Sequence, residues 1–257
     1  MGTRLDWHYF SSGPREAVLL KLLNSDVRIK NVYVTDPARW PKIAPTIDLA
    51  KKNGLSVHIL TRRDLEKPPA ELKNEMCLSV GFGIVFPKIF LDHIKLALNV
   101  HGTLLPKYRG ARTLNWVIEN GEVESGVSIH IIDEHIDNGP IIFQKKFSIS
   151  KFDTGKSLAR KTLLFEPEVV LEAVKKFEKS GDSIAQIQKI NEQDDYYPHN
   201  RIRSHSELNP AHSLQDLYNK IRASDPEQYP AHFYIDGQKV CVKLWRENKP
   251  DSEFDLI

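Results

Sequence analysis

An amide, an imidazole and a carboxylate occur in an order that suits acyl-group chemistry: Asn99, His101 and Asp137. Asn99 and His101 lie two residues apart around a short apolar run, and side chains two apart on a strand point to the same side. An amide can donate a hydrogen bond to the oxyanion that forms when a nucleophile adds to a carbonyl group. An imidazole can take or give a proton, and a carboxylate can orient it. The three residues therefore predict a site for acyl-type transfer.

Each of these residues also has a simpler interpretation when it is taken singly. An Asn-x-His pair is common at turns and strand ends, and Asp137 precedes Asn138-Gly139, which is typical of a turn. The chain has ten histidines, so one His near one Asp is weak support. A metal hydrolase built on His101, Asp133 and Asp137 is a further alternative. It lacks a second well-spaced His or Cys ligand, so we expect no metal.

Short apolar runs alternate with helical stretches through the first 180 residues. We expect strands at 7–10, 32–34, 57–60, 77–80, 98–101, 126–132 and 141–147, and helices at 17–23, 47–52, 113–120 and 154–179. Pro167 should kink the last of these helices or divide it. The alternation predicts an α/β domain with a mostly parallel sheet. Ligands of such sheets bind outside the carboxyl ends of the strands, where the three polar residues are expected.

The pattern changes after Gly181. A strand-like run at 184–190, a helix at 213–223 and a hairpin at 229–244 that turns at Asp236-Gly237 are expected there. The sequence therefore predicts a catalytic domain over residues 1–180 and a small helix-and-hairpin extension over 181–257.

Composition excludes several other classes of protein. Of the 257 residues, 40% are hydrophobic, 36 are Lys or Arg and 34 are Asp or Glu. The basic residues are nearly balanced by acidic ones and form no basic stripe, so we expect no nucleic-acid partner. Cys77 and Cys241 have no metal-ligand spacing and suit a reducing compartment. The first ten residues contain no apolar run, so no signal peptide or membrane span is expected there. Together these features predict a cytoplasmic protein without a membrane partner.

The segment from Leu98 to Gly110, LNVHGTLLPKYRG, resembles the signature of the N10-formyltetrahydrofolate-dependent formyltransferases. Further marks follow in the same order as in that family: Asn115-Trp116, Asn120-Gly121-Glu122, SGVSI at 125–129 and DEHIDNGPI at 133–141. The resemblance departs at His135, where the family usually has a small residue. It also departs in the first strand, which lacks the family's apolar opening with an internal glycine.

The resemblance implies a doubly wound, mostly parallel sheet of the Rossmann-like formyltransferase variety. It implies an N-formyltransferase with Asn99, His101 and Asp137 as catalytic residues and N10-formyltetrahydrofolate as formyl donor. The folate is expected to contact mainly the backbone of two segments, at Phe82, Ile84, Val85, Phe86, Asp133 and Ile136. From the residues alone, the segment 81–87 is equally a buried strand end and turn.

Relatives of this family formylate initiator methionyl-tRNA, a purine-pathway ribonucleotide or amino sugars on nucleotide carriers. The residues after Gly181 resemble the short sugar N-formyltransferases at DYYP (195–198), YNKIRA (218–223) and YPAHFY (229–234). We therefore expect a nucleotide-diphosphate-linked amino-dideoxy sugar as acceptor, of the kind used in lipopolysaccharide O-antigen synthesis. Arg and Lys pair with phosphates and aromatic rings stack on bases, which suggests contacts at Lys107, Tyr108, Arg109, Asn219 and Arg222. By analogy, the extension is expected to assist a homodimer.

Several alternatives stay open from the sequence. The same residues would serve another folate-dependent formyltransferase, acting on methionyl-tRNA or in the purine pathway, or a hydrolase of formyltetrahydrofolate. A non-catalytic protein that binds a nucleotide sugar or folate is the alternative from a different class. The substrate residues also have structural interpretations, as a loop that Tyr108 and Arg109 order and as a helix turn that packs on the core.

Overall fold

A computed structural model describes residues 5–190, 196–197 and 202–252 of the chain. The chain folds as two compact units, and each is interleaved along the sequence. The first unit comprises Met1–His101, Val127–Lys145 and Phe165–Ile190, and the second comprises Gly102–Gly126, Lys146–Leu164 and Asn191–Ile257. The sequence-based division at residue 180 into a catalytic domain and an extension stays a prediction.

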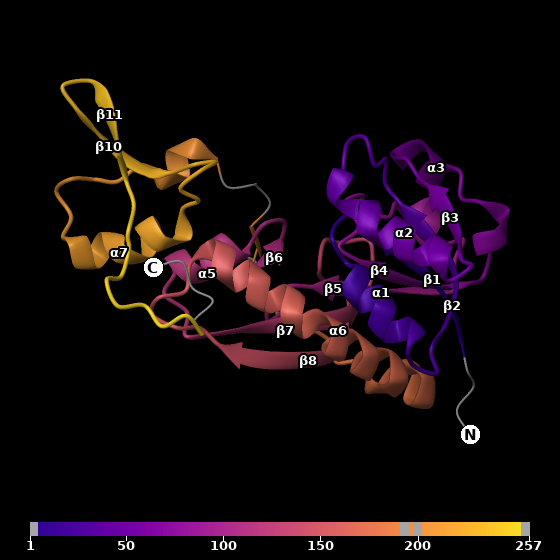
Figure 1. Cartoon of the computed structure of the whole chain (residues 1–257). Helices are drawn as coiled ribbons and strands as arrows, with labels where there is room; N and C mark the ends of the chain where they lie inside the picture. Colours follow the sequence, from indigo (N-terminus) through magenta and orange to yellow (C-terminus); the bar gives the residue numbers. More distant parts are fainter. Residues whose placement is uncertain (1–4, 191–195, 198–201, 253–257) are drawn as a thin grey trace. The chain divides into compact units, whose positions relative to one another are not determined.

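Seven strands form one sheet in the order β3-β2-β1-β4-β5-β7-β8 (Figure 1). They are β1 (Asp6–Ser11), β2 (Arg28–Val34), β3 (Ser56–Ile59), β4 (Met76–Val80), β5 (Leu96–His101), β7 (Glu124–Ile131) and β8 (Ile141–Ser148). The pairs from β3 to β5 are all parallel, whereas β5 and β7 are antiparallel. The strand order reverses between β1 and β4, which is where doubly wound sheets bind ligands. The predicted fold class is confirmed.

The helices are shorter than the sheet is wide, with one exception. They are α1 (Glu16–Leu23), α2 (Ala44–Lys52), α3 (Arg62–Glu66), α4 (Lys88–Leu91), α5 (Leu114–Glu119), α6 (Gly155–Ser180) and α7 (Leu214–Ala223). Single 3-10 turns occur at η1 (Pro41–Ile43), η2 (Ala70–Leu72), η3 (Gly181–Ile184) and η4 (Arg203–Ser206). The α6 helix continues through Pro167, so of the two predicted effects the division does not occur and the kink stays a prediction. Buried Val169, Val170 and Phe177 follow the proline. Their packing outweighs the one backbone hydrogen bond that proline removes.

A second expectation fails just after α6. The run 184–190 was expected to be a strand, but it forms only an isolated bridge between Gln186 and Ile141. Ile187, an apolar residue in the middle of this run, is 86% exposed. An apolar residue in a short run does not by itself fix a strand.

Aromatic rings form the core of the first unit. The Phe10 ring in β1 stacks on Tyr33 in β2 at 4.8 Å between centroids. Phe86 and Phe90 meet Phe10 edge-on at 5.3 and 5.9 Å. Such pairs are favourable beyond the apolar area that they bury. Because Phe86 lies in the loop after β4, this cluster also anchors the loop at the carboxyl edge of the sheet.

The second unit contains two small sheets beside α5 and α7. The strands β10 (Ala231–Ile235) and β11 (Gln238–Val242) form the predicted hairpin, and Asp236 and Gly237 turn it with φ of 47° and 75°. Positive φ at both positions is the I′ geometry that an Asp-Gly pair favours. The other sheet pairs β6 (Arg109–Gly110) with β9 (Tyr196–Tyr197). Of the segment DYYP, Asp195 and Pro198 lie outside the described residues.

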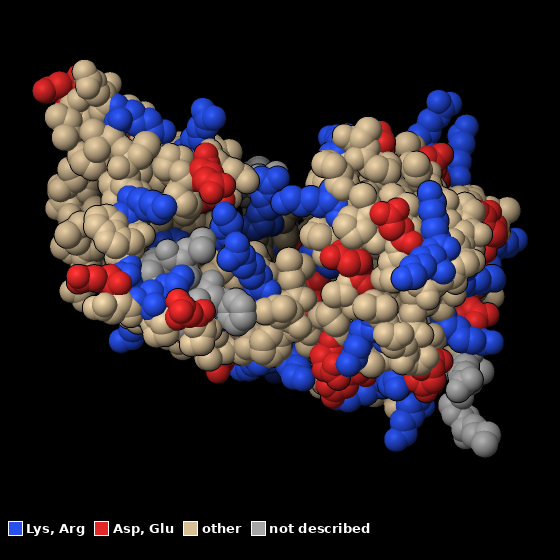
Figure 2. All heavy atoms as spheres, in the orientation of Figure 1, with Lys and Arg blue, Asp and Glu red and all other residues tan. Residues whose placement is uncertain are grey.

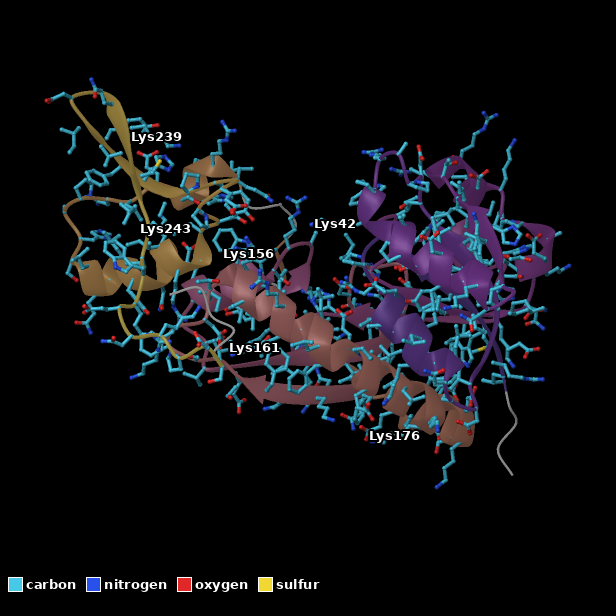
Figure 3. The ribbon with its side chains drawn as sticks, viewed as in Figure 1. Lys42, Lys156, Lys161, Lys176, Lys239 and Lys243 are labelled. Atoms are coloured by element: carbon cyan, nitrogen blue, oxygen red, sulfur yellow. The ribbon has the colours of Figure 1, made fainter. Side chains whose placement is uncertain are left out.

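Charged side chains are dispersed over the surface. Lys, Arg, Asp and Glu are interspersed over the face shown in Figure 2. Lys156 and Lys161 extend from the first turns of α6, and Lys239 and Lys243 belong to the hairpin region (Figure 3). Within residues 5–190, 196–197 and 202–252, no helix has the length and apolar character that crossing a membrane requires.

A buried histidine in β1 makes the stability of the fold depend on pH. The His8 side chain is fully buried, and its Nε2 lies 3.5 Å from Glu75 Oε2. Burial lowers the pKa of His8 below its ordinary 6.5, although the Glu75 carboxylate acts in the opposite direction. The unfolded chain therefore binds a proton at higher pH than the folded chain does. It follows that the free energy of unfolding falls as the pH drops through 6.5 toward the lowered pKa of His8.

We expect His8→Leu to flatten this dependence. Urea unfolding at several pH values from about 8 to about 5 would measure it, with the exposed His212→Leu as control. Each unit by which the pKa is lowered corresponds to about 1.4 kcal/mol of unfolding free energy. Equal losses of stability on acidification in His8→Leu and in the wild-type protein would contradict this assignment.

Candidate active site

Cross-strand register places the amide of Asn99 between two polar neighbours. Asn99 in β5 is directly opposite Ser79 in β4 and opposite His130 in β7. Residues directly opposite each other in a sheet present their side chains on the same face. The Ser79 hydroxyl donates to Asn99 Oδ1 at 2.8 Å, and Asn99 Nδ2 lies 3.1 Å from His130 Nε2. The serine thus fixes which end of the Asn99 amide bears the donors.

His101 ends β5 on the same side as Asn99. Its side chain is buried, and its Nδ1 lies 3.3 Å from Asp137 Oδ2. A carboxylate at Nδ1 selects the tautomer with a proton on that nitrogen and fixes the orientation of the ring. Nε2 of His101 is then the nitrogen that can exchange a proton with a substrate.

The Asp137 carboxylate contacts both other members of the predicted set. Its Oδ1 accepts from Asn99 Nδ2 at 3.3 Å, while Oδ2 faces His101. Asp137 lies in the loop between β7 and β8, as predicted, and has a φ of 51°. The structure therefore brings Asn99, His101 and Asp137 together within the first unit. Their catalytic roles stay predictions.

Two residues of this cluster were missed by the sequence analysis, Ser79 and His130. His130 is 2% exposed, and its Nδ1 lies 2.8 Å from the Ile131 carbonyl oxygen, which assigns the ring proton to Nδ1. Its Nε2 then accepts from the Asn99 amide and also lies 3.3 Å from Asp137 Oδ1. A proton taken up by His130 or Asp137 can be shared between the two. The only signal in the sequence was a polar residue inside each of two apolar strands.

The loop that contains Asp137 is held by its own polar groups. The Asp133 carboxylate accepts from the His135 backbone N–H at 2.9 Å and from Asn138 Nδ2 at 3.3 Å. At Gly139, an added Cβ would lie 1.9 Å from the Ile131 carbonyl oxygen, so only glycine fits. Asp133, predicted to contact folate, thus has a role inside the loop, and Ile136 is 43% exposed. His135 is exposed as well.

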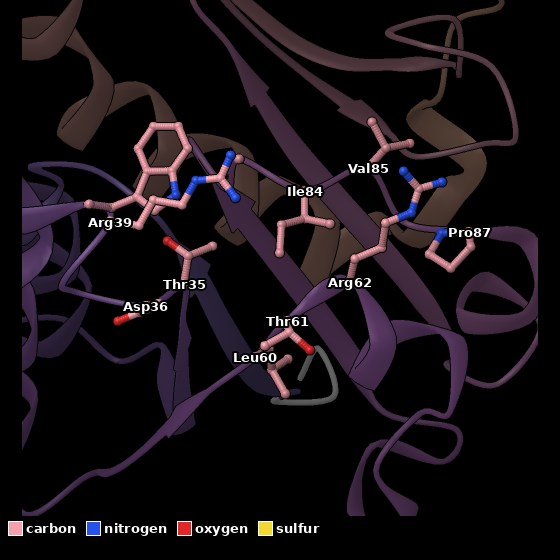
Figure 4. A pocket seen from close by; sticks show the side chains of 11 residues that line it. Thr35, Asp36, Arg39, Leu60, Thr61, Arg62, Ile84, Val85 and Pro87 are labelled. Atoms are coloured by element: carbon pink, nitrogen blue, oxygen red, sulfur yellow. The ribbon is translucent and has the colours of Figure 1, made fainter.

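The second predicted folate segment borders a cavity. The loop after β4 supplies Gly83, Ile84, Val85 and Pro87 to a cavity of about 700 Å³, whose other walls follow β2 and β3 (Figure 4). Phe82 and Phe86 turn their rings onto Phe10, whereas Val85 is 69% exposed. These two rings therefore pack on the core, and Gly83, Ile84, Val85 and Pro87 are the part of the loop that faces the cavity. Arg39 and Arg62 extend toward the loop from the other walls.

The five predicted substrate residues all lie in the second unit. Lys107 forms an ion pair with Glu122 at 3.2 Å, and the Tyr108 hydroxyl donates to the same carboxylate at 2.9 Å. Arg109 is buried in β6. Tyr108 also stacks on Tyr197, which stacks on Trp116, with centroids 5.3 and 5.5 Å apart.

The Arg222 guanidinium group makes its hydrogen bonds inside the same unit. Its Nη1 donates to the carbonyl oxygens of Ser150 and Asp153 at 3.2 and 2.8 Å, and its Nε donates to Asn219 Oδ1 at 2.8 Å. Burial lowers the pKa of Arg222, although it stays charged. Arg222 and Asn219 therefore brace the loop before α6, and their binding of substrate stays a prediction.

Comparison with known proteins identifies the family. A family model described as formyl transferase matches residues 29–174, which is more than half of the chain. The chain belongs to this family. The predictions of a formyltransferase-family protein and of an N-formyltransferase enzyme are thereby confirmed. No group of three His, Cys, Asp or Glu side chains is placed to hold a metal ion within the described part of the chain.

The similar proteins include methionyl-tRNA formyltransferases and sugar N-formyltransferases. The methionyl-tRNA formyltransferase of Acetivibrio thermocellus is 31% identical over 216 residues, which are 81% of this chain and 67% of that protein. The chain spans between 55% and 77% of the length of several methionyl-tRNA formyltransferases. A crystal structure of a sugar N-formyltransferase from a Shewanella species superposes with a TM-score of 0.73 at 22% identity, covering 96% of this chain and all of that one.

A third relative was solved with ligands. The N-formyltransferase of Helicobacter canadensis, in complex with folinic acid and dTDP-3-aminofucose, has a TM-score of 0.69 at 22% identity and covers 93% of this chain and 86% of its own. At such identities the superpositions show a shared fold. The acceptor of this chain is therefore a matter for proposal.

We expect Ser79→Ala to lower the rate of formyl transfer with little loss of stability. Without the Ser79 hydroxyl, the Asn99 amide can rotate, and loss of one oriented donor at an oxyanion costs about 10²-fold or more when complete. Rotation that is only partial should lower kcat by about 10-fold. Steady-state kinetics would measure this effect. Ser11→Ala is the matched control, because Ser11 is buried on neighbouring β1 and donates to the Val80 carbonyl. Equal kcat values for the two variants would contradict the role of Ser79.

Proposed function

We propose that the protein transfers a formyl group from N10-formyltetrahydrofolate to the amino group of a nucleotide-diphosphate-linked amino-dideoxy sugar. The observation that carries the reaction is the Asp137 carboxylate, which lies 3.3 Å from both the Asn99 amide and the His101 ring in a member of the formyl transferase family. Folate as donor is supported by the folinic acid bound in the Helicobacter canadensis relative. The acceptor class rests on different observations.

The sugar acceptor is supported by the extent of the structural likeness. The match to the Shewanella sugar N-formyltransferase includes all of that chain and 96% of this one, so it extends into the second unit. The stack of Tyr108, Tyr197 and Trp116 in that unit offers flat aromatic surface of the kind on which a nucleobase packs. Such a sugar would suit lipopolysaccharide O-antigen synthesis, which takes place from precursors made in the cytoplasm.

The reaction follows from the arrangement of the three polar residues. The lone pair of the sugar amine attacks the formyl carbon, and the carbonyl oxygen becomes an oxyanion. The Asn99 amide stabilises it, and His101 does so as well once its Nε2 carries a proton. Asp137 takes the proton that the amine loses, directly or through a water molecule, and His130 shares it. The C=O bond then re-forms, the bond from carbon to N10 breaks, and N10 receives the proton that Asp137 took from the amine. The enzyme forms no covalent intermediate, because the amine is itself the nucleophile.

The cavity beside the loop after β4 suits the extended part of the folate. The tail of a folate ends in carboxylates, and Arg39 and Arg62 line this cavity together with Ile84 and Val85. Guanidinium groups pair well with carboxylates. We place the pterin against the backbone of the loop and the tail toward the two arginines.

A second acceptor, methionyl-tRNA, is favoured by the 31% identity to the Acetivibrio thermocellus enzyme. A purine-pathway ribonucleotide acceptor, hydrolysis of the donor and ligand binding without catalysis are further candidates. Hydrolysis would leave the aromatic stack without a role, and binding without catalysis would leave the cluster at Asp137 without one. A homodimer is part of the proposal as well: Tyr234 and Ile235 of the hairpin are 51% and 54% exposed and offer apolar surface to a second copy.

Mass spectrometry of reaction products would test the function. The protein would be mixed with N10-formyltetrahydrofolate and amino-dideoxy sugars linked to thymidine, guanosine or uridine diphosphate, with methionyl-tRNA in a parallel reaction. We expect one sugar to gain a formyl group, and His101→Ala and Asp137→Asn to lose at least about 10²-fold in rate. His212→Ala, which changes an exposed histidine, should keep the wild-type rate. Formylated tRNA or free formate instead of formylated sugar would overturn the proposed acceptor.

We expect Arg62→Ala to raise the KM for N10-formyltetrahydrofolate by about 10-fold, which corresponds to one hydrogen bond to a charged group. The KM for the nucleotide sugar and kcat should change little, since the tail is remote from the reacting carbon. Arg63→Ala is the matched control, because Arg63 is the exposed neighbour of Arg62 in α3 and does not line the cavity. Identical KM values for folate in the two variants would place the tail elsewhere.

A further inference from the structure

The segment after η3 turns a polar side chain inward and an apolar one outward. Gln188 is only 9% exposed, whereas its neighbour Ile187 is 86% exposed. Glutamine is mostly exposed in proteins and isoleucine mostly buried, so apolar packing does not explain this arrangement. Burial of an amide is unfavourable unless hydrogen bonds replace those it made to water. The partners of Gln188 therefore indicate what this residue does.

Gln188 holds the loop that contains Asp137. Its Nε2 donates to the Asp137 carbonyl oxygen at 3.0 Å and to the Gly139 carbonyl oxygen at 2.7 Å. Both protons of one amide group thus bind two carbonyls of the same short loop. Its Oε1 is buried and has no hydrogen-bond partner within the described residues, which is a cost to the fold.

The position of Gln188 is itself fixed by the sheet. Gln186 and Ile141 exchange two backbone hydrogen bonds of 2.8 Å, which attach the segment to the first residue of β8. Gln188 follows this anchored residue by only two positions. Anchoring at Gln186 thus sets where the Gln188 amide lies. We call the two hydrogen bonds from Gln188 to the loop the clamp. The clamp connects the Asp137 peptide to the sheet through Gln186.

Asp137 is a residue that needs such a clamp. Its φ of 51° is in the left-handed region, which is unfavourable for a residue other than glycine. Its carboxylate meets His101 Nδ1, His130 Nε2 and Asn99 Nδ2 at 3.3 Å each, at the outer limit of a useful contact. A small rotation of the Asp137 peptide would break these contacts.

We propose that Gln188 is a positioning residue that keeps the Asp137 carboxylate in register with His101 and Asn99. The inference rests on the proposed function, in which Asp137 takes the amine proton. It adds a residue that lies outside the segment matched by the family model, which ends at residue 174. Gln188 acts only through the loop and has no contact of its own with the reacting atoms.

The test compares two identical substitutions, Gln188→Met and Gln186→Met. Methionine keeps the length and volume of glutamine but removes its donors. Gln186 has an exposed side chain, and its backbone bonds survive the change. We expect Gln188→Met to lower kcat by about 10- to 100-fold, since a misplacement of about 1 Å can cost 10²-fold. The KM values for both substrates should stay within about twofold of those of Gln186→Met. General destabilisation would not produce this split, in which kcat falls while KM is kept.

Hydrogen exchange gives a measurement that does not depend on activity. Backbone amides in residues 133–140 should exchange faster in Gln188→Met than in Gln186→Met, while amides of β4 and β5 exchange alike in both. Gln188→Asn retains the amide on a shorter chain. If Gln188→Met does not fold, Gln188→Asn replaces it and should show the same split with a smaller loss of kcat.

The outcomes distinguish a failure of the positioning role of Gln188 from a failure of the proposed function. Unchanged kcat in Gln188→Met with unchanged exchange of the loop overturns the positioning role. Faster exchange without a change in kcat overturns it too, because Asp137 would then not depend on the clamp. If the wild-type protein transfers no formyl group, the proposed function fails, and unchanged exchange would then overturn the clamp independently.

Discussion

The candidate site depends on one carboxylate that is almost withdrawn from water. The Asp137 side chain is 12% exposed, and a charge in such a position is tolerated only when it is paired or hydrogen bonded. Its two oxygens divide the task, one facing His101 and the other facing Asn99 and His130. A single loop residue thus connects side chains from two antiparallel strands. The contacts among these side chains persist only as long as Asp137 keeps its position.

The remainder of the first unit can be understood as the support for that carboxylate. The register of β4, β5 and β7 puts Ser79, Asn99 and His130 in a row on one face of the sheet. Gly139 lets the loop pass close to the Ile131 carbonyl, and Gln188 donates two hydrogen bonds to carbonyls of the loop. The aromatic cluster around Phe10 stiffens the loop after β4, which borders the proposed folate cavity. Rigid elements hold reacting groups more accurately than loops do, and here the loop is tied to the sheet.

Much of this arrangement could be predicted from the sequence, and the failures have definite physical causes. Asn99, His101 and Asp137 were predicted because they occur in an ordered set of motifs that resembles a known family, and the strands of the sheet followed from apolar runs. Ser79 and His130 were missed because the register between strands is a long-range property that one sequence does not display. Gln188 was missed because the run 184–190 was expected to be a strand, whereas the structure exposes Ile187 and buries Gln188. In the second unit, Arg222 was expected to bind substrate, and its hydrogen bonds to two carbonyls could not be foreseen from its type.

The central claim, that Asp137 sets the proton position on His101, can be measured directly. Long-range ¹⁵N–¹H correlation of the histidine rings reports which nitrogen of a neutral imidazole carries the proton. The account predicts that His101 carries it on Nδ1 in the wild-type protein, and that Asp137→Ala abolishes this preference while the fold is retained. A proton on Nε2 of His101 in the wild-type protein, unchanged in Asp137→Ala, would contradict the account.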